Sequence, residues 1–113
     1  MEAKYIIDAQ LDSYRNRDLE SFLSFYSPEI VIKSGDGNII MGSLDAMRET
    51  YRRSFSENPS TKVVIANRIA LGEFVIDEEH LTGFTKPGSP EEMRAVLIYR
   101  VRDELITEVT LLI

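Results

Sequence analysis

The chain has 113 residues, enough for one domain, and it contains no cysteine, so disulfides, thiol catalysis and thiolate zinc sites are excluded. It carries 13 lysines and arginines against 19 aspartates and glutamates, and its net charge of −6 would repel a nucleic-acid backbone. We therefore expect a single domain over residues 1–113 with no nucleic-acid partner. The first residues lack the basic and apolar pattern of a signal peptide, and the apolar stretches are too short to span a membrane. These features favour a cytoplasmic location.

The N-terminal part of the chain has the periodicity of helices. Residues 3–17 are predicted to form the first, because core-type side chains recur every three or four positions along one face, at Ala3, Ile7, Leu11 and Tyr14. Asp18 is a candidate N-cap for a second short helix, LESFLSFY, and Ser27-Pro28 is expected to end it.

A hairpin and a third helix are predicted next. Two β-prone runs, Ile30–Ile32 and Ile39–Met41, flank Asp36-Gly37, a pair suited to a tight turn. Ser43 is expected to cap a helix over residues 44–55. One face of this helix carries Leu44, Met47, Tyr51 and Phe55.

After Asn58-Pro59 the apolar period changes from that of helices to that of strands. Four strands are predicted, at residues 61–71, 73–85, 93–102 and 105–113. Their short connections favour an antiparallel meander. The order helix, helix, hairpin, helix and four strands predicts an α+β domain with its helices in the N-terminal half.

Several stretches in this order resemble the nuclear transport factor 2-like superfamily, in particular its ketosteroid-isomerase-like and SnoaL-like (polyketide-cyclase-like) branches. They are SYRNRDLESFLSFYSPEIVI, MGSLDAMRETYRRSF, GEFVIDEEHLTGF and IYRVRDELITEV, and together they cover nearly the whole chain. The resemblance implies a cone, in which a strongly curved antiparallel sheet packs on three helices around an apolar pocket. It also implies a homodimer formed through the outer sheet face. Family members include enzymes and binding modules, so the fold leaves the chemistry open.

The catalytic residues of ketosteroid isomerase itself are not matched. That enzyme uses a tyrosine on its first helix, an aspartate base on its first strand and a protonated aspartic acid on a late strand. The resemblance places these roles on Gln10, Ser34 and Leu97. Serine and leucine cannot hold an abstracted proton at neutral pH, so this mechanism is not expected here.

The segment GEFVIDEEHLTGF contains the only histidine of the chain. Side chains alternate between the faces of a strand, and comparison with the isomerase turns Glu78 and His80 toward the cavity. They would lie about 7 Å apart and are our candidate general acid–base pair. Two alternatives stay open. The pair could simply reach solvent near the strand end, or a one-residue shift of register could turn Asp77 and Glu79 inward instead.

The expected ligand contacts are mainly aromatic and aliphatic. We expect them at Tyr14, Tyr51, Phe55, Leu97, Tyr99 and Val109, although ordinary core packing is an alternative for each aromatic ring. Buried tyrosine hydroxyls would supply the few polar groups that orient a ligand. One histidine without cysteine, and the absence of phosphate-loop or dinucleotide motifs, predict neither a metal nor a cofactor.

Three functions follow as hypotheses. The first is binding of a small apolar or amphipathic molecule in the pocket. The second is a cofactor-independent isomerase, cyclase or dehydratase that uses Glu78, His80 and a tyrosine. The third is a scaffold for dimerisation or partner binding whose cone is filled by its own side chains. Val96 and Ile98 are expected on the outer sheet face, where they would form a dimer surface.

Overall fold

The computed structural model describes all 113 residues. Its three helices are α1 (Ala3–Arg15), α2 (Leu19–Ser24) and α3 (Leu44–Glu57). Its strands are β1 (Tyr26–Ser34), β2 (Ile39–Met41), β3 (Lys62–Leu71), β4 (Phe74–Thr82), β5 (Glu92–Arg102) and β6 (Leu105–Leu112). The predicted α+β class and the predicted order of elements are confirmed. None of the helices is both long and apolar enough to cross a bilayer.

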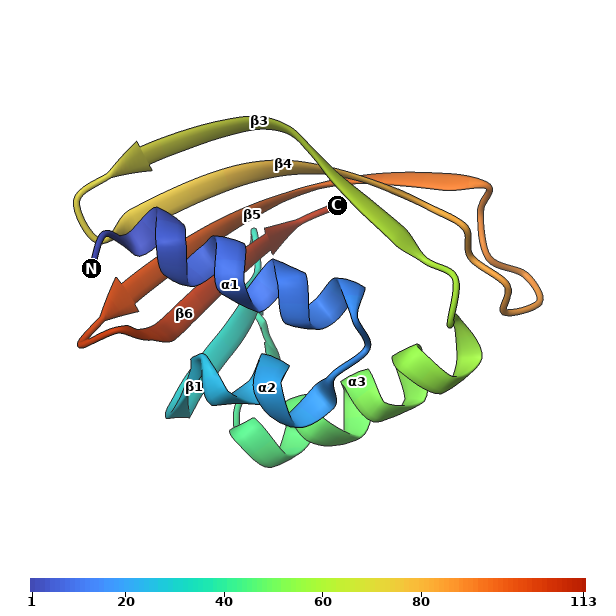
Figure 1. The fold of residues 1–113 in the computed structure, drawn as a ribbon, viewed down its shortest axis with the longest axis horizontal. Coiled ribbons are helices and arrows are strands. Elements are labelled where there is room, and N and C mark those ends of the chain that lie inside the picture. The colour runs from blue at the N-terminus through green and yellow to red at the C-terminus, as the bar shows by residue number, and fades with distance from the viewer.

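The strands form one six-stranded sheet in the order β2-β1-β6-β5-β4-β3. The last four strands are an antiparallel meander, as predicted, but β1 lies parallel to β6, so the sheet is mixed. The parallel pair arises because the chain leaves the sheet through α3, re-enters at the far edge as β3, and returns strand by strand to β1. Figure 1 shows the sheet curving over α1, with α2 and α3 on the same concave side.

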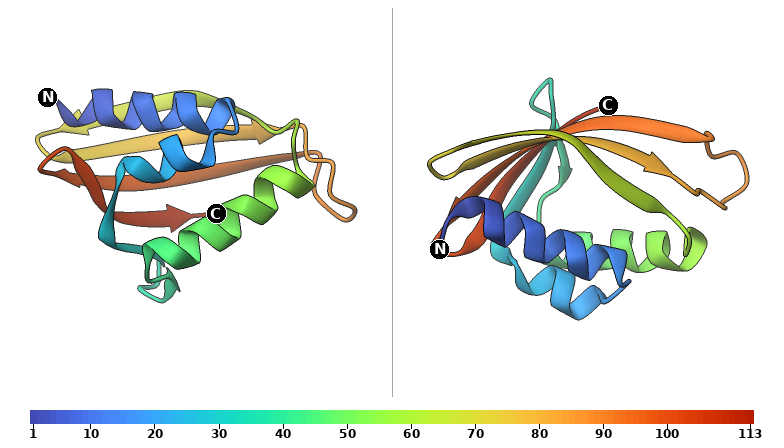
Figure 2. Two further views of the ribbon diagram at one scale, coloured as in Figure 1. Left: turned by 60° about the horizontal axis from the view of Figure 1, so that its bottom comes forward. Right: turned by 45° about the horizontal axis from the view of Figure 1, so that its top comes forward.

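The sheet is bent rather than closed. Register shifts occur in β3 between Ile65 and Asn67 and in β5 next to Val101, and such bulges increase local twist and bend a strand. Figure 2 shows the curved and twisted sheet from two further sides, with the helices covering one face of it. This is the cone expected from the resemblance.

Local sequence signals fix the helix starts. The Asp18 carboxylate accepts a hydrogen bond from the Ser21 amide at 3.1 Å, and the Ser43 hydroxyl accepts one from the Ala46 amide at 3.0 Å, as predicted for both caps. The second helix is shorter than predicted, because Tyr26 already belongs to β1 and pairs with Ile106 of β6.

The interior lies between α1 and the concave face of the sheet. The predicted face of α1 is turned inward, with Ile7 and Leu11 fully buried. From the sheet side, Val75, Tyr99 and Ile106 are buried against it. Tyr14, Tyr51 and Leu97 share this interior, because all three line the same cavity.

Candidate functional site

A cavity of about 170 Å³ lies between the helices and the concave sheet face. Among its wall residues only Gln10 and Glu79 are neither aliphatic nor aromatic. The wall runs from buried Tyr26 and Tyr99 to Ile113, which is 82% exposed. The full set is Gln10, Leu11, Tyr14, Phe22, Tyr26, Ile32, Met41, Tyr51, Val63, Glu79, Leu81, Met93, Ala95, Leu97, Tyr99, Val109, Leu111 and Ile113.

Aromatic rings from three helices and β1 build one side of the cavity. The ring centroid of Phe22 lies 4.8 Å from that of Tyr51 and 5.1 Å from that of Tyr26. The Tyr14 ring meets Tyr51 edge-on at 6.4 Å. Phe55 packs against Tyr14 at 5.4 Å but lies behind the wall, so it supports the ring cluster without lining the cavity. Of the expected contact residues, Tyr14, Tyr51, Leu97, Tyr99 and Val109 reach the wall and Phe55 does not.

The orientation that we predicted for β4 is wrong. Register with β5 places Asp77 opposite Leu97 and Glu79 opposite Ala95, and these residues all face the interior. Glu78 and His80 therefore lie on the outer face of the sheet. The one-residue alternative is the observed one, because the inward side of the strand also carries Val75, which is buried in the core, and Leu81, which is partly buried against it.

Glu78 and His80 have partners at the surface. The Asn67 amide donates to Glu78 at 2.7 Å, and Arg94 pairs with the same carboxylate. These two contacts lower the pKa of Glu78 below its ordinary value. His80 lies 3.1 Å from Glu92 and is exposed by two-fifths of its side chain (41%). Neither side chain faces the cavity, where an acid–base pair would have to act.

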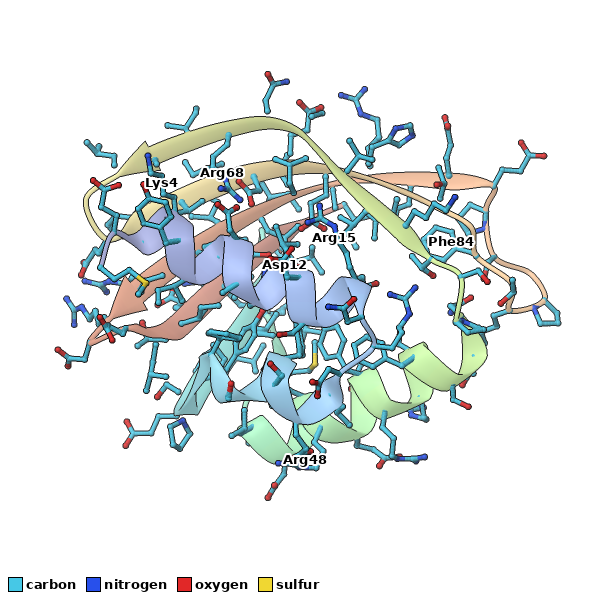
Figure 3. The ribbon with its side chains drawn as sticks, in the orientation of Figure 1. Lys4, Asp12, Arg15, Arg48, Arg68 and Phe84 are labelled. Carbon is cyan, nitrogen blue, oxygen red and sulfur yellow. The ribbon has the colours of Figure 1, made fainter.

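Of the two inward carboxylates, Asp77 is fully paired. It is 0% exposed and accepts hydrogen bonds from Arg68 Nε at 2.6 Å and from Nη2 at 2.9 Å. The same guanidinium donates to Asp8 of α1 at 2.6 Å, and these bonds raise the pKa of Arg68. Figure 3 shows Arg68 between β3 and α1. The pair ties the sheet edge to the helix and occupies both carboxylate oxygens.

Glu79 has no such partner. It is 7% exposed, lines the cavity and forms no ion pair. Burial first, and then the charge of Asp77, raise its pKa to about 7, although the hydroxyl of Tyr99 and the charge of Arg15 oppose the rise. Its own charge helps to raise the pKa of the surrounding phenols, Tyr14, Tyr26, Tyr51 and Tyr99. A buried carboxylate that titrates near neutrality is a feature of functional sites.

Gln10 is the second polar group of the wall. Its side-chain oxygen accepts a hydrogen bond from the Tyr26 hydroxyl at 2.9 Å, which fixes the amide. Its Nε2 is buried without any partner. Buried donors are rarely left unpaired in proteins, and this nitrogen is the one buried side-chain donor of the wall that lacks an acceptor.

Two of the three positions that correspond to the catalytic residues of ketosteroid isomerase lie at the cavity. Gln10 and Leu97 line the cavity, whereas Ser34 lies at the outer end of β1 and accepts the Gly37 amide through its backbone oxygen. In the sequence, Gln10 stood out only because it replaces the catalytic tyrosine of ketosteroid isomerase. Glu79 was expected to face inward only if the strand register shifted by one residue. A buried Asp-x-Glu pair flanked by Val75 and Leu81 was the available signal. No group of three or more His, Asp or Glu side chains is placed to hold a metal ion.

The curved sheet, the three helices and the apolar cavity between them define a cone-shaped domain of the nuclear transport factor 2-like class. A family model described as "SnoaL-like domain" matches residues 7–109, and the chain belongs to this family. No curated protein matches the sequence.

Solved structures share the fold at low sequence identity. An uncharacterised cystatin-fold protein from Novosphingobium aromaticivorans superposes with a TM-score of 0.88 at 20% identity, over 98% of this chain and 97% of that one. A hypothetical protein with a ketosteroid isomerase-like fold from Catenulispora acidiphila was solved in complex with trimethylamine. It superposes with a TM-score of 0.76 at 17% identity, over 94% of this chain and 82% of that one. An LEH-like epoxide hydrolase from M. tuberculosis superposes with a TM-score of 0.81 at 18% identity, over 97% of this chain and 80% of that one. At these identities the likeness extends to the fold alone.

Proposed function

We propose that the protein, acting as one domain of residues 1–113, binds a compact apolar or amphipathic small molecule in its cavity. The composition of the wall carries this proposal: an apolar and aromatic lining is interrupted only by Gln10 and Glu79, both buried. Small-molecule sites typically combine such a lining with a few polar groups that orient the ligand. The open volume counts against a scaffold whose cone is filled by its own side chains.

The cavity volume limits the size of the ligand. An apolar protein cavity of about 150 Å³ binds benzene. The cavity volume here, about 170 Å³, therefore suits a single substituted ring or a short branched chain. The Catenulispora acidiphila protein with this fold was solved with trimethylamine, which is smaller still.

Binding of p-cresol, a compact ring with one polar oxygen, tests the proposal. We expect saturable binding to the wild-type protein by calorimetry. Leu97→Trp should abolish it, because a larger side chain on the wall fills the cavity. Ile98→Trp is the matched control, since the next residue of β5 faces outward and its substitution should leave the affinity unchanged. Equal effects of the two substitutions would refute binding in the cavity.

One observation favours a second function, acid–base catalysis without a cofactor. General bases work best with a pKa near the working pH, and the pKa of Glu79 is about 7. This role replaces the one that we predicted for Glu78 and His80. Glu79 would accept a proton from the carbon beside a substrate carbonyl: the C–H bond breaks, the carboxyl O–H bond forms, and tyrosine hydroxyls hold the enolate oxygen. Return of the proton to another carbon would complete an isomerisation.

Hydrogen–deuterium exchange tests this second function. Cyclohexanone incubated with the protein in D₂O should lose its α-hydrogens faster than in buffer, as measured by NMR. Glu79→Gln should remove the acceleration, whereas Glu78→Gln should not, because Glu78 lies on the outer face. Exchange at the buffer rate with the wild-type protein would argue against a catalytic Glu79.

We also propose that the protein forms a twofold dimer through the outer sheet face and works in the cytoplasm. Ile69, Ile76 and Ile98 face each other in a row across β3, β4 and β5 on that face. Ile69 is 64% exposed and Leu71 beside the row is 76% exposed, which is unusual for a monomer surface. The cytoplasmic location rests on the composition, which is free of cysteine.

A further inference from the structure

The cavity wall carries a negative group without a positive counterpart. Glu79 is its only acidic side chain, and no lysine or arginine lines it. The nearby basic side chains have other partners: Arg15 donates to the Val63 carbonyl at 3.2 Å, and Arg68 holds Asp77 and Asp8. Buried charges in proteins are normally paired, as Asp77 is. When Glu79 is ionised, a cationic ligand would supply the positive charge that the wall lacks.

The surroundings of Glu79 suit a cation of the alkylammonium type. Aromatic rings attract ammonium groups electrostatically, and rings arranged around a pocket recognise methylated ammonium ions in particular. The methyl groups of such an ion also fit an apolar wall. Five aromatic residues line this cavity together with Glu79, namely Tyr14, Phe22, Tyr26, Tyr51 and Tyr99.

Gln10 adds a requirement for an oxygen atom. Its Nε2 is a donor without a partner in the wall, and its orientation is fixed by the bond from Tyr26 to its oxygen. An ammonium group cannot accept this hydrogen bond, so the ligand needs a separate acceptor, such as a hydroxyl or ether oxygen. The ammonium group and the oxygen acceptor of the ligand must fit together in a cavity of about 170 Å³.

We propose that the ligand is a small alkylammonium ion that carries an oxygen acceptor, with its cation beside the Glu79 carboxylate and its oxygen bonded to Gln10 Nε2. This inference rests on the proposed binding function and specifies its ligand class. It is independent of acid–base catalysis, because a cation held by Glu79 would use the carboxylate as a binding group.

The proposal predicts a particular pH dependence. The groups that face Glu79 are Asp77 on β4, Arg15 on α1 and the four phenols, and burial raises the pKa of each of those phenols. The phenols therefore stay neutral, and Glu79, with a pKa of about 7, is the facing group that changes charge between pH 6 and 8. A cation should bind more tightly at pH 8, where the carboxylate is ionised, than at pH 6.

The experiment compares three probes by calorimetry with the full chain. Choline carries both features, 3,3-dimethylbutan-1-ol is its uncharged isostere, and tetramethylammonium lacks the oxygen. At pH 8 choline should bind at least about tenfold more tightly than the isostere, and the preference should shrink several-fold at pH 6. The isostere should show no such change. Glu79→Gln should remove the preference for charge at both pH values.

Gln10→Met, which keeps the side-chain volume, tests the second contact. The substitution should weaken the binding of choline and of its isostere by a similar factor of about ten, and it should leave the affinity for tetramethylammonium unchanged. Equal wild-type affinities for choline and its isostere at pH 8 would overturn the proposal while leaving the binding function intact. Failure of choline, the isostere and p-cresol alike would instead overturn the binding function itself. The pH dependence of the wild-type protein decides the matter if a variant does not fold.

Discussion

Asp77 and Glu79 lie on the same buried face of β4, two residues apart, yet only Asp77 is paired with an arginine. Arg68 holds both oxygens of Asp77, at 2.6 and 2.9 Å, whereas Glu79 feels the charge of Arg15 but forms no ion pair. One carboxylate therefore fastens the sheet edge to α1, and the other remains available to the cavity. The negative charge of Asp77 also contributes to the raised pKa of Glu79.

The raised pKa of Glu79 predicts how stability depends on pH. The folded protein holds this proton more tightly than the unfolded chain, so the contribution of Glu79 is complete below about pH 4.5 and is lost as the pH rises to about 7. Glutamine cannot ionise, so Glu79→Gln avoids this loss. The variant should therefore be more stable relative to the wild type at pH 8 than it is at pH 4. We expect a difference of about 3 kcal/mol in the free energy of unfolding, measured with urea.

Glu78→Gln is the control for this prediction. Glu78 neighbours Glu79 in sequence, but its pKa is lowered by Asn67 and Arg94 on the outer face. Its substitution should not reproduce the gain in stability at pH 8. If both substitutions behave alike, the chemical environments of the two glutamates are not those described above.

Removal of Arg68 should be costly because it leaves Asp77 buried without a counter-charge. We expect Arg68→Met to lower the free energy of unfolding by about 3 kcal/mol. The double substitution Arg68→Met with Asp77→Leu should recover much of this loss, since it removes the stranded charge. A double variant no more stable than Arg68→Met alone would show that the charge of Asp77 is not the cause.

Gly83 is predicted to be irreplaceable at the end of β4. Its φ is +80°, and a Cβ there would lie 2.4 Å from the Ser60 carbonyl oxygen. Gly88 also has a positive φ, +87°, but a Cβ would meet nothing within 4 Å. Gly88→Ala should therefore cost about 1 kcal/mol for its backbone conformation, and Gly83→Ala clearly more. Thermal unfolding of the two variants measures the difference, and equal losses would contradict the steric contact.

The order of elements could be read from the sequence because periodicity, caps and turn residues act locally. Asp18 and Ser43 cap their helices as predicted. Each of these determinants lies within a few residues of its effect.

The sequence could not show in the same way which side chains of β4 point toward the interior. Both alternating sets of this strand contain apolar and acidic residues, because its outer face carries the Ile76 row and its inner face carries Asp77 and Glu79. Partners distant in sequence decide the matter: Arg68 on β3 compensates Asp77, and helices close over Glu79. The parallel pairing of β1 with β6 is equally non-local.

The outer sheet face predicts the oligomeric state. We expect sedimentation equilibrium to give a dimer at micromolar concentration, because the row of Ile69, Ile76 and Ile98 would be covered by a second copy. Ile76→Lys should shift the protein to monomer by placing a charge in the contact. Ser56→Lys, on the exposed side of α3, is the control and should leave the dimer intact. A wild-type protein that sediments as a monomer would contradict the proposed interface.

The position of a bound ligand tests the central proposal most directly. Intermolecular nuclear Overhauser effects between p-cresol and the protein can distinguish the two faces of β5 in one sample. We predict effects to Leu97, Tyr99 and Val109, which line the cavity, and none to Val96 or Ile98 on the outer face. Effects confined to Val96 and Ile98 would place the ligand on the outer face of the sheet and contradict binding in the cavity.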